Sequence, residues 1–218
     1  MALIPPRETR QLRRHLAERL AGPVALRFFR RGRPAAGGEG LGSDETLALL
    51  EEVTALSDGL ALSVHDLDAE PALAAELGVT RVPTTVLTGA ARGRVRWLGL
   101  PTGHELGALL GDLLDVSRGA TSLGAAAQRS LAGLRSELRL AVFVTPSCAF
   151  CPAVARLAHQ LAVESPRVSA DVIEAVEFPE LVERYGVSGV PTVVVNERRA
   201  VPGFLDEAAF VRRVLAAA

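Results

Sequence analysis

The sequence contains two cysteines, Cys148 and Cys151, separated by two residues. A close pair of thiols can bind a metal ion, exchange disulfides or fill buried space. Tetrahedral zinc needs four ligands, and apart from these two cysteines only His159, eight residues after Cys151, follows nearby. A zinc site would therefore need a second chain. Redox chemistry is the favoured interpretation of the pair, and no metal is expected.

The pair joins a predicted strand to a predicted helix. The apolar run 138–144 precedes it, and apolar residues at helical spacing continue to about Glu164. At the helix N-terminus, free N–H groups and the helix dipole favour a thiolate, which makes Cys148 the predicted nucleophile. Cys151, one turn further in, is the predicted resolving cysteine that attacks the mixed disulfide. Pro152 suits the first turn, where its missing N–H breaks no bond.

The chain also contains a long internal repeat. Residues 71–87 and 179–195 align without gaps at a spacing of 108 residues, and such a period indicates two copies of a whole domain. In the first copy we expect strands at 24–29, 60–65, 84–87 and 94–98 and helices at 44–56 and 103–116. In the second copy we expect strands at 138–144, 168–176, 192–195 and 200–204 and helices at 148–164 and 206–217.

The order of these elements, βαβαββα with one further helix in front, resembles the thioredoxin-like layout. The sequence therefore predicts an α/β protein of two tandem thioredoxin-like folds, each a mixed β-sheet flanked by helices. We expect residues 1–118 to form a fold without a CxxC pair and residues 119–218 to form the fold that carries it. Gly119 breaks one helix, and Thr121 or Ser122 is the expected cap of the next.

A Val-Pro dipeptide stands before the same predicted strand in both copies, at Pro83 and at Pro191. A proline in this position is a candidate for a cis peptide bond, with an ordinary trans turn as the alternative. A cis Pro191 would place the Val190 backbone beside the cysteines, where a substrate peptide could pair with it. The other residues expected to bind substrate are Pro146, Ala149, Phe150 and Gly189.

Glu174 lies in an otherwise apolar predicted strand, where a carboxylate is costly unless it is paired, hydrated or used. Near the cysteines it could accept the proton when Cys151 attacks. A solvated acid at the end of a strand is an equally good interpretation. His15, His65 and His104 form no recognisable group and are expected to be ordinary surface or core residues.

Charge and hydropathy exclude several classes of function. The 218 residues carry 24 basic and 25 acidic side chains, so no global field attracts nucleic acid or an anionic membrane. No apolar run is long enough to span a bilayer or to form a signal-peptide core. We therefore expect a cytoplasmic protein. Persistent structural disulfides are rare in that compartment, which again favours a redox pair over a staple.

These residues resemble the protein disulfide oxidoreductases of archaea and thermophilic bacteria, which consist of two fused thioredoxin folds. Residues 143–152, 174–180 and 98–106 carry the resemblance. The second half is also similar to the N-terminal domain of the alkyl hydroperoxide reductase flavoprotein subunit. Many disulfide oxidoreductases of this group carry a second CxxC in the first fold. Here residues 30–38 contain no cysteine, so the first fold cannot perform dithiol chemistry.

The leading hypothesis is an enzyme that exchanges disulfides with protein substrates through Cys148 and Cys151 without a bound cofactor. The resemblance to the flavoprotein domain implies a narrower variant, an electron carrier from a thioredoxin reductase to a peroxiredoxin. A G-x-G-x-x-G motif followed by an acidic residue is missing, so neither flavin nor nicotinamide is expected to bind. The alternative is a scaffold or binding protein whose cysteines share a metal or are vestigial.

Overall fold

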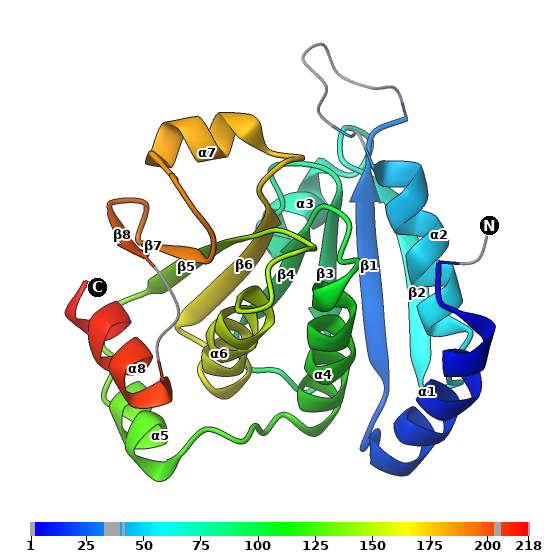
Figure 1. Cartoon of the computed structure of the whole chain (residues 1–218), viewed down its shortest axis with the longest axis horizontal. Helices are drawn as coiled ribbons and strands as arrows, with labels where there is room; N and C mark the ends of the chain where they lie inside the picture. Colours follow the sequence, from blue (N-terminus) through cyan, green and yellow to red (C-terminus); the bar gives the residue numbers. More distant parts are fainter. Residues whose placement is uncertain (1–2, 33–39, 41, 203–205, 218) are drawn as a thin grey trace.

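The computed structural model describes residues 3–32, 40, 42–202 and 206–217. Its strands form one mixed sheet with eight strands in the order β2-β1-β3-β4-β6-β5-β7-β8 (Figure 1). The strands are β1 (Val24–Arg30), β2 (Leu60–Asp66), β3 (Thr84–Thr88), β4 (Arg94–Leu98), β5 (Leu138–Val144), β6 (Val168–Glu174), β7 (Thr192–Val195) and β8 (Arg199–Pro202). The helices are α1 (Pro6–Arg19), α2 (Ser43–Thr54), α3 (Pro71–Leu77), α4 (His104–Arg118), α5 (Ala125–Ala132), α6 (Cys151–Glu164), α7 (Pro179–Tyr185) and α8 (Glu207–Ala216).

The two halves of the sheet repeat one pairing pattern. In the first, β1 is parallel to β2 and antiparallel to β3, which pairs with β4. In the second, β5 is parallel to β6 and antiparallel to β7, which pairs with β8. This confirms the predicted α/β architecture of two tandem copies. The copies also share their sheet, because β4 pairs in parallel with β6 from Arg94 opposite Ser169 to Leu98 opposite Ile173.

Neighbouring residues of each strand point to opposite faces of the sheet. In β1, Phe28 belongs to the large core on one face and Phe29 to a smaller core on the other. The face toward the viewer in Figure 1 carries α4 and α6 side by side. On the opposite face, α3 and α7 each cover a small core of their own. Since α4 belongs to the first copy and α6 to the second, the large core extends across both copies.

Some predicted boundaries are wrong by a few residues. The helix expected from residue 148 begins at Cys151, with Pro152 in its first turn. The strand expected to reach residue 176 ends at Glu174. The strand expected at 200–204 is β8, Arg199–Pro202, and Gly203 and Phe204 lie outside the described residues. Residues 33–38 of the first copy, where no cysteine stands, also lie outside them.

The segment that connects the copies differs from the prediction in its helix cap. Helix α5 follows Gly124 without a side-chain cap, so neither Thr121 nor Ser122 caps it. Their hydroxyls bond to α6 instead, because the segment runs along that helix. The Thr121 hydroxyl donates to Glu164 Oε1 at 2.9 Å, and Ser122 Oγ accepts from Gln160 at 3.1 Å. The placement of a domain boundary after residue 118 remains a prediction.

Candidate redox site

The cysteine pair lies where the loop after β5 enters α6, and Cys148 and Cys151 are joined in a disulfide with their Cα atoms 5.5 Å apart. The Cys148 amide donates to the Thr145 carbonyl at 3.0 Å, which turns the chain back toward α6. Cys148 is half-buried, whereas Cys151 is fully buried. A partner protein can therefore approach the sulfur of Cys148 but not that of Cys151.

Helix α6 positions the pair, although differently from the expected arrangement. Cys151 is its first residue, and Cys148 precedes it in a turn. The Cys151 amide donates to the Cys148 carbonyl at 3.4 Å, which connects the turn to the helix. The positive end of the helix dipole acts over the first turn and the residues next to it. Cys148 lies three residues before α6, so the thiolate expected there remains a prediction.

Both Val-Pro peptide bonds are cis, Val82-Pro83 in the first copy and Val190-Pro191 in the second. The cis geometry expected at Pro191 is thus present. The Val190 carbonyl oxygen lies 3.9 Å from Cys148 Sγ, so the structure brings this segment beside the redox pair. Gly189 is exposed and Val190 is half-buried. The Val190 backbone is therefore next to the sulfur that an incoming disulfide would meet.

Apolar side chains are exposed around the pair. Phe150 is 61% exposed and Val176 is 76% exposed, and Ala149 is exposed between the two cysteines. The Ala175 amide donates to the Val144 carbonyl at 2.9 Å, which holds the end of β6 against the start of the redox loop. Val176, which directly follows, is a surface residue of this site that the sequence did not identify, because it continues an apolar run expected to be buried strand.

Glu174 is buried and lies opposite Val144 at the end of the sheet where the redox loop begins. Burial raises the pKa of its carboxyl group. Its Oε2 atom accepts the Glu177 amide at 2.7 Å. Asp66 occupies the matching place in the first copy and accepts the amides of Asp68 and Ala69. Glu174 thus caps the loop after its strand, and its proposed role in proton transfer remains a hypothesis.

Glu105 is a second buried acid at this end of the molecule, and the sequence did not single it out. It is 1% exposed, and among the described residues neither carboxylate oxygen has a hydrogen-bond partner. Burial and the nearby charge of Asp112 raise its pKa to about 8. The sequence gives one signal for Glu105: it is an acidic residue at a position of the predicted helix where the helical spacing calls for an apolar side chain.

The first turn of α4 brings Glu105 to the redox loop. The His104 amide donates to the Pro146 carbonyl at 3.1 Å, two residues before Cys148. Gly103 adopts a φ of 59°, and a Cβ there would lie 2.5 Å from the same carbonyl oxygen. Only glycine fits this approach without strain. The first copy, which has no cysteine, therefore packs the backbone just before Glu105 against the redox loop of the second copy.

The remaining histidines take ordinary places. His65 contacts Glu70 at 2.9 Å and stacks on Phe29. His159, in contrast, is fully buried between α4 and the sheet.

Across the described ranges, no group of three or more His, Cys, Asp or Glu side chains could hold a metal ion. None of the helices described is both long and apolar enough to cross a membrane.

Comparisons with known proteins agree with this geometry. The thioredoxin domain family matches residues 138–216. The F subunit of alkyl hydroperoxide reductase from Xanthomonas campestris pv. phaseoli is 31% identical over 156 residues, which are 71% of this chain and 28% of that protein. A thioredoxin of Methanocaldococcus jannaschii is 36% identical over 62 residues, 28% of this chain and 73% of that protein. The chain thus spans 28% of the length of the first of these relatives.

Two solved structures match nearly the whole chain. A protein disulfide oxidoreductase from Aeropyrum pernix K1 has a TM-score of 0.83 and 29% identity and covers 98% of this chain and 93% of that one. An N-terminal domain of the alkylhydroperoxide reductase from Enterococcus faecalis has a TM-score of 0.86 and 24% identity, and the match covers 97% of this chain and 99% of that one. Because both matches extend over the two copies, this chain shares its tandem fold with these proteins.

Proposed function

This chain belongs to the thioredoxin-like disulfide oxidoreductases, and from that premise we propose that Cys148 is the nucleophile and Cys151 the resolving thiol. The observation that carries the assignment is the difference in exposure within the pair. Cys148 is half-buried and lies beside the Val190 carbonyl, while Cys151 is fully buried at the start of α6. A substrate disulfide can reach only the first sulfur.

Reduction of a substrate would take two exchange steps. The Cys148 thiolate attacks one sulfur of the substrate disulfide, so that a mixed disulfide forms and one substrate thiolate leaves. The Cys151 thiol loses its proton, and its sulfur attacks that of Cys148, which releases the second substrate thiolate. Two electrons pass from the dithiol to the substrate, and the two leaving thiolates take up two protons. Substrate oxidation is the same sequence in reverse.

Glu105 supports the proton transfer in this scheme. A carboxyl group whose pKa is raised to about 8 is protonated at neutral pH but close to its titration range. Such a group can give a proton to a leaving thiolate and regain one from Cys151. Glu174 is the competing candidate, but one of its oxygens is already used as a loop cap. Glu174 Oε1 is also buried without a partner among the described residues, so Glu174 remains a candidate beside Glu105.

The substrate would bind across the apolar surface around the pair. Pro146, Ala149 and Phe150 lie on the redox loop, and the backbone of Gly189 and Val190 offers a short edge for β-like pairing. Exposed apolar side chains at one place mark a protein-binding surface. Val176 adds to this surface from the adjoining loop.

The relatives narrow the choice of partners. Several are named as the F subunit of alkyl hydroperoxide reductase, and this chain matches only 28% of their length. We propose that the chain receives electrons from a thioredoxin reductase and passes them to a peroxiredoxin. The chain would then act in the cytoplasm as a carrier, without a resident flavin or nicotinamide. The likeness to the disulfide oxidoreductase of Aeropyrum pernix supports the wider role with protein disulfides.

Insulin reduction tests the wider role. The wild-type protein with dithiothreitol should reduce insulin, and the Cys148→Ser protein should not. Cys151→Ser should trap mixed disulfides through Cys148, and mass spectrometry of the trapped proteins tests for a peroxiredoxin. Equal insulin turnover by wild type and Cys148→Ser would contradict the assignment as an enzyme. Zinc in the purified wild-type protein would favour the alternative of a scaffold protein. Adducts formed through Cys151 in Cys148→Ser would reverse the two cysteine roles.

A further inference from the structure

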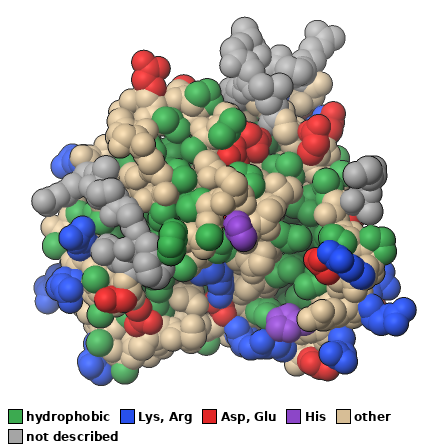
Figure 2. Space-filling model, viewed as in Figure 1, with side chains coloured by type: hydrophobic (Ala, Val, Ile, Leu, Met, Phe, Trp, Pro, Cys, Tyr) green, Lys and Arg blue, Asp and Glu red, His purple; other side chains and the backbone are tan. Residues whose placement is uncertain are grey.

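A second site candidate lies away from the cysteines, on the face of the molecule that Figure 2 shows. The C-terminal part of α1, the C-terminal part of α4, the segment that follows α4, and α6 enclose a cleft of about 480 Å³. Its charged lining consists of His15, Arg19, Arg118 and Arg156 with one carboxylate, Asp115. We name it the basic cleft. Figure 2 shows basic side chains gathered along the lower edge of this face.

The helices direct these basic side chains toward the same cleft. His15 and Arg19 are four residues apart and therefore lie on the same side of α1. The Ala21 amide, just after α1, donates to Ser117 Oγ at 3.2 Å and holds the end of α1 against the last turn of α4. Arg118 is the last residue of α4. Arg156 reaches the same space from α6, which is the helix that begins at Cys151.

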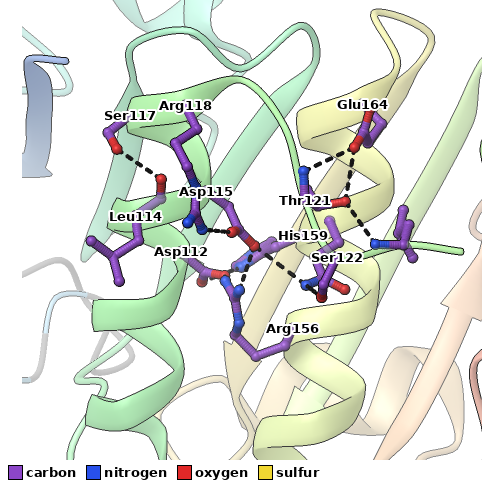
Figure 3. Close-up of polar contacts among 12 residues, drawn as sticks. Asp112, Leu114, Asp115, Ser117, Arg118, Thr121, Ser122, Arg156, His159 and Glu164 are labelled. Carbon is purple, nitrogen blue, oxygen red and sulfur yellow. Dashed lines mark hydrogen bonds and ion pairs between the residues drawn. The ribbon is translucent and has the colours of Figure 1, made fainter. Parts of the chain in front are cut away.

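Two of the cations are already held in position by buried carboxylates (Figure 3). Arg156 forms ion pairs with both Asp112 and Asp115, and Arg118 Nη2 lies 2.6 Å from Asp115 Oδ1. Asp115 is buried, and Asp112 is buried and also bonded to His159. Asp115 itself lines the cleft, whereas Asp112 lies outside its lining. Each guanidinium carries five N–H donors, so both arginines keep donors beyond those that pair with the carboxylates.

The other two basic residues, His15 and Arg19, have no such counterpart. Within the residues that the structure describes, neither His15 nor Arg19 has a hydrogen bond or ion pair, although Glu18 on the same helix pairs with Arg14. Arg19 is exposed and His15 is half-buried. Asp112 and Asp115 together balance Arg156 and Arg118. Among the described residues, Arg19 is thus the arginine of the cleft without a paired carboxylate, and an anion would supply its counter-charge.

Helix α4 leaves space for the side chain of Arg156 at Gly111. A Cβ at Gly111 would lie 2.9 Å from Arg156 Nε and 3.0 Å from Arg156 Cζ. Any side chain at position 111 would push the guanidinium group aside. The hydroxyl of Ser122 accepts from Gln160, so its own hydrogen can be donated to a ligand. The cleft combines guanidinium donors that are fixed in place with a hydroxyl donor at its rim.

We propose that the basic cleft binds a small ligand that bears phosphate groups. Guanidinium groups pair with phosphate oxygens through parallel hydrogen bonds, and several of them converge here. The volume exceeds that of one phosphate and accommodates a diphosphate with a further group attached. A ligand in the cleft would connect α1 and α4 of the first copy to α6 of the second. The site is separate from the thiol-disulfide exchange and does not depend on it.

Isothermal titration with inorganic pyrophosphate at low ionic strength tests the proposal. The full chain should bind pyrophosphate, and Arg19→Gln should weaken binding about tenfold or more. Arg19 is exposed and unpaired, so this variant should keep its fold. Arg212→Gln, which removes an exposed arginine from α8, is the matched control and should bind as wild type does.

Two further probes define the ligand. Tighter binding of ADP than of pyrophosphate would assign the cleft to a nucleotide, and equal binding would assign it to the diphosphate group alone. Citrate that binds as tightly as pyrophosphate would overturn the preference for phosphate. The proposal would also fail if pyrophosphate showed no binding at millimolar concentration. An equal loss of affinity in Arg19→Gln and Arg212→Gln would place the anion elsewhere.

Discussion

The Nδ1 atom of His159 lies 2.6 Å from the Oδ2 atom of Asp112, and both side chains are fully buried between α4 and α6. The other ring nitrogen, Nε2, lies 3.0 Å from the Arg96 carbonyl, which can only accept a hydrogen bond. Nε2 is therefore the ring nitrogen that can donate to this carbonyl. Trp97 Nε1 donates to the same carboxylate oxygen of Asp112 at 3.0 Å.

Asp112 is thus the shared acceptor for side chains from both copies, and its removal should destabilise the protein strongly. Asp112→Ala leaves His159 without its buried carboxylate partner and Arg156 with only one of its two. We expect a loss of about 3 to 5 kcal/mol in the free energy of unfolding, measured by urea denaturation. Asp58→Ala, at an exposed site, should change it by less than about 0.5 kcal/mol. Similar values for the two variants would contradict this account of the interface.

Glu105 should make stability depend on pH. Its pKa is raised to about 8 by burial, from 4.5. Between these values the unfolded chain loses the proton while the folded protein keeps it, so stability falls as pH rises through this range and is lowest above the folded pKa. Glu105→Gln removes the effect. The variant should gain on the order of 3 kcal/mol relative to wild type between about pH 4 and about pH 9.

Urea titrations of wild type and Glu105→Gln across that pH range measure the difference. Glu180→Gln, an exposed acid on α7, is the matched control and should follow the wild-type curve. A stability difference between wild type and Glu105→Gln that stays constant with pH would show that Glu105 does not titrate within the range.

The two buried acids should differ in their effect on turnover. If Glu105 transfers the proton, Glu105→Gln should slow insulin reduction by about a hundredfold. The alkylation of Cys148 by iodoacetamide should change little, because that step does not need the Cys151 proton. Glu174→Gln should keep most of the activity and lose about 1 kcal/mol of stability from its weakened loop cap. The reverse pattern would assign the proton transfer to Glu174.

The exposed apolar side chains should matter for protein substrates only. Phe150→Ser removes apolar surface from the redox loop and Val176→Ser removes it from the loop after β6, so KM for insulin should rise about threefold to tenfold for each variant. The rate with a small aromatic disulfide should not change, since such a substrate needs only the sulfur. Val64→Ser, at another exposed valine, serves as the control and should leave both rates unchanged. A parallel loss with the small disulfide would indicate damage to the cysteine pair itself.

Much of the architecture could be read from local patterns. The repeat around Pro83 and Pro191 predicted two copies, and the apolar runs placed the strands to within a few residues. The spacing of Cys148 and Cys151 identified the chemistry because it brings two sulfurs together within one turn. The cis bond at Pro191 could be expected because it depends on a dipeptide and its neighbouring strand. Each of these features is encoded over a few consecutive residues.

The tertiary structure decided the relationships between the copies. The sequences of β4 and β6 do not predict that the two strands pair, because backbone hydrogen bonds between strands depend little on which side chains are present. That pairing places α4 against α6. It brings Glu105 to the redox loop and Arg118 to Arg156, although neither pair is close in the chain. The sequence alone determined two folds and one redox pair. The packing of the folds determined which distant side chains share a site, because such contacts depend on the joined sheet rather than on any local periodicity.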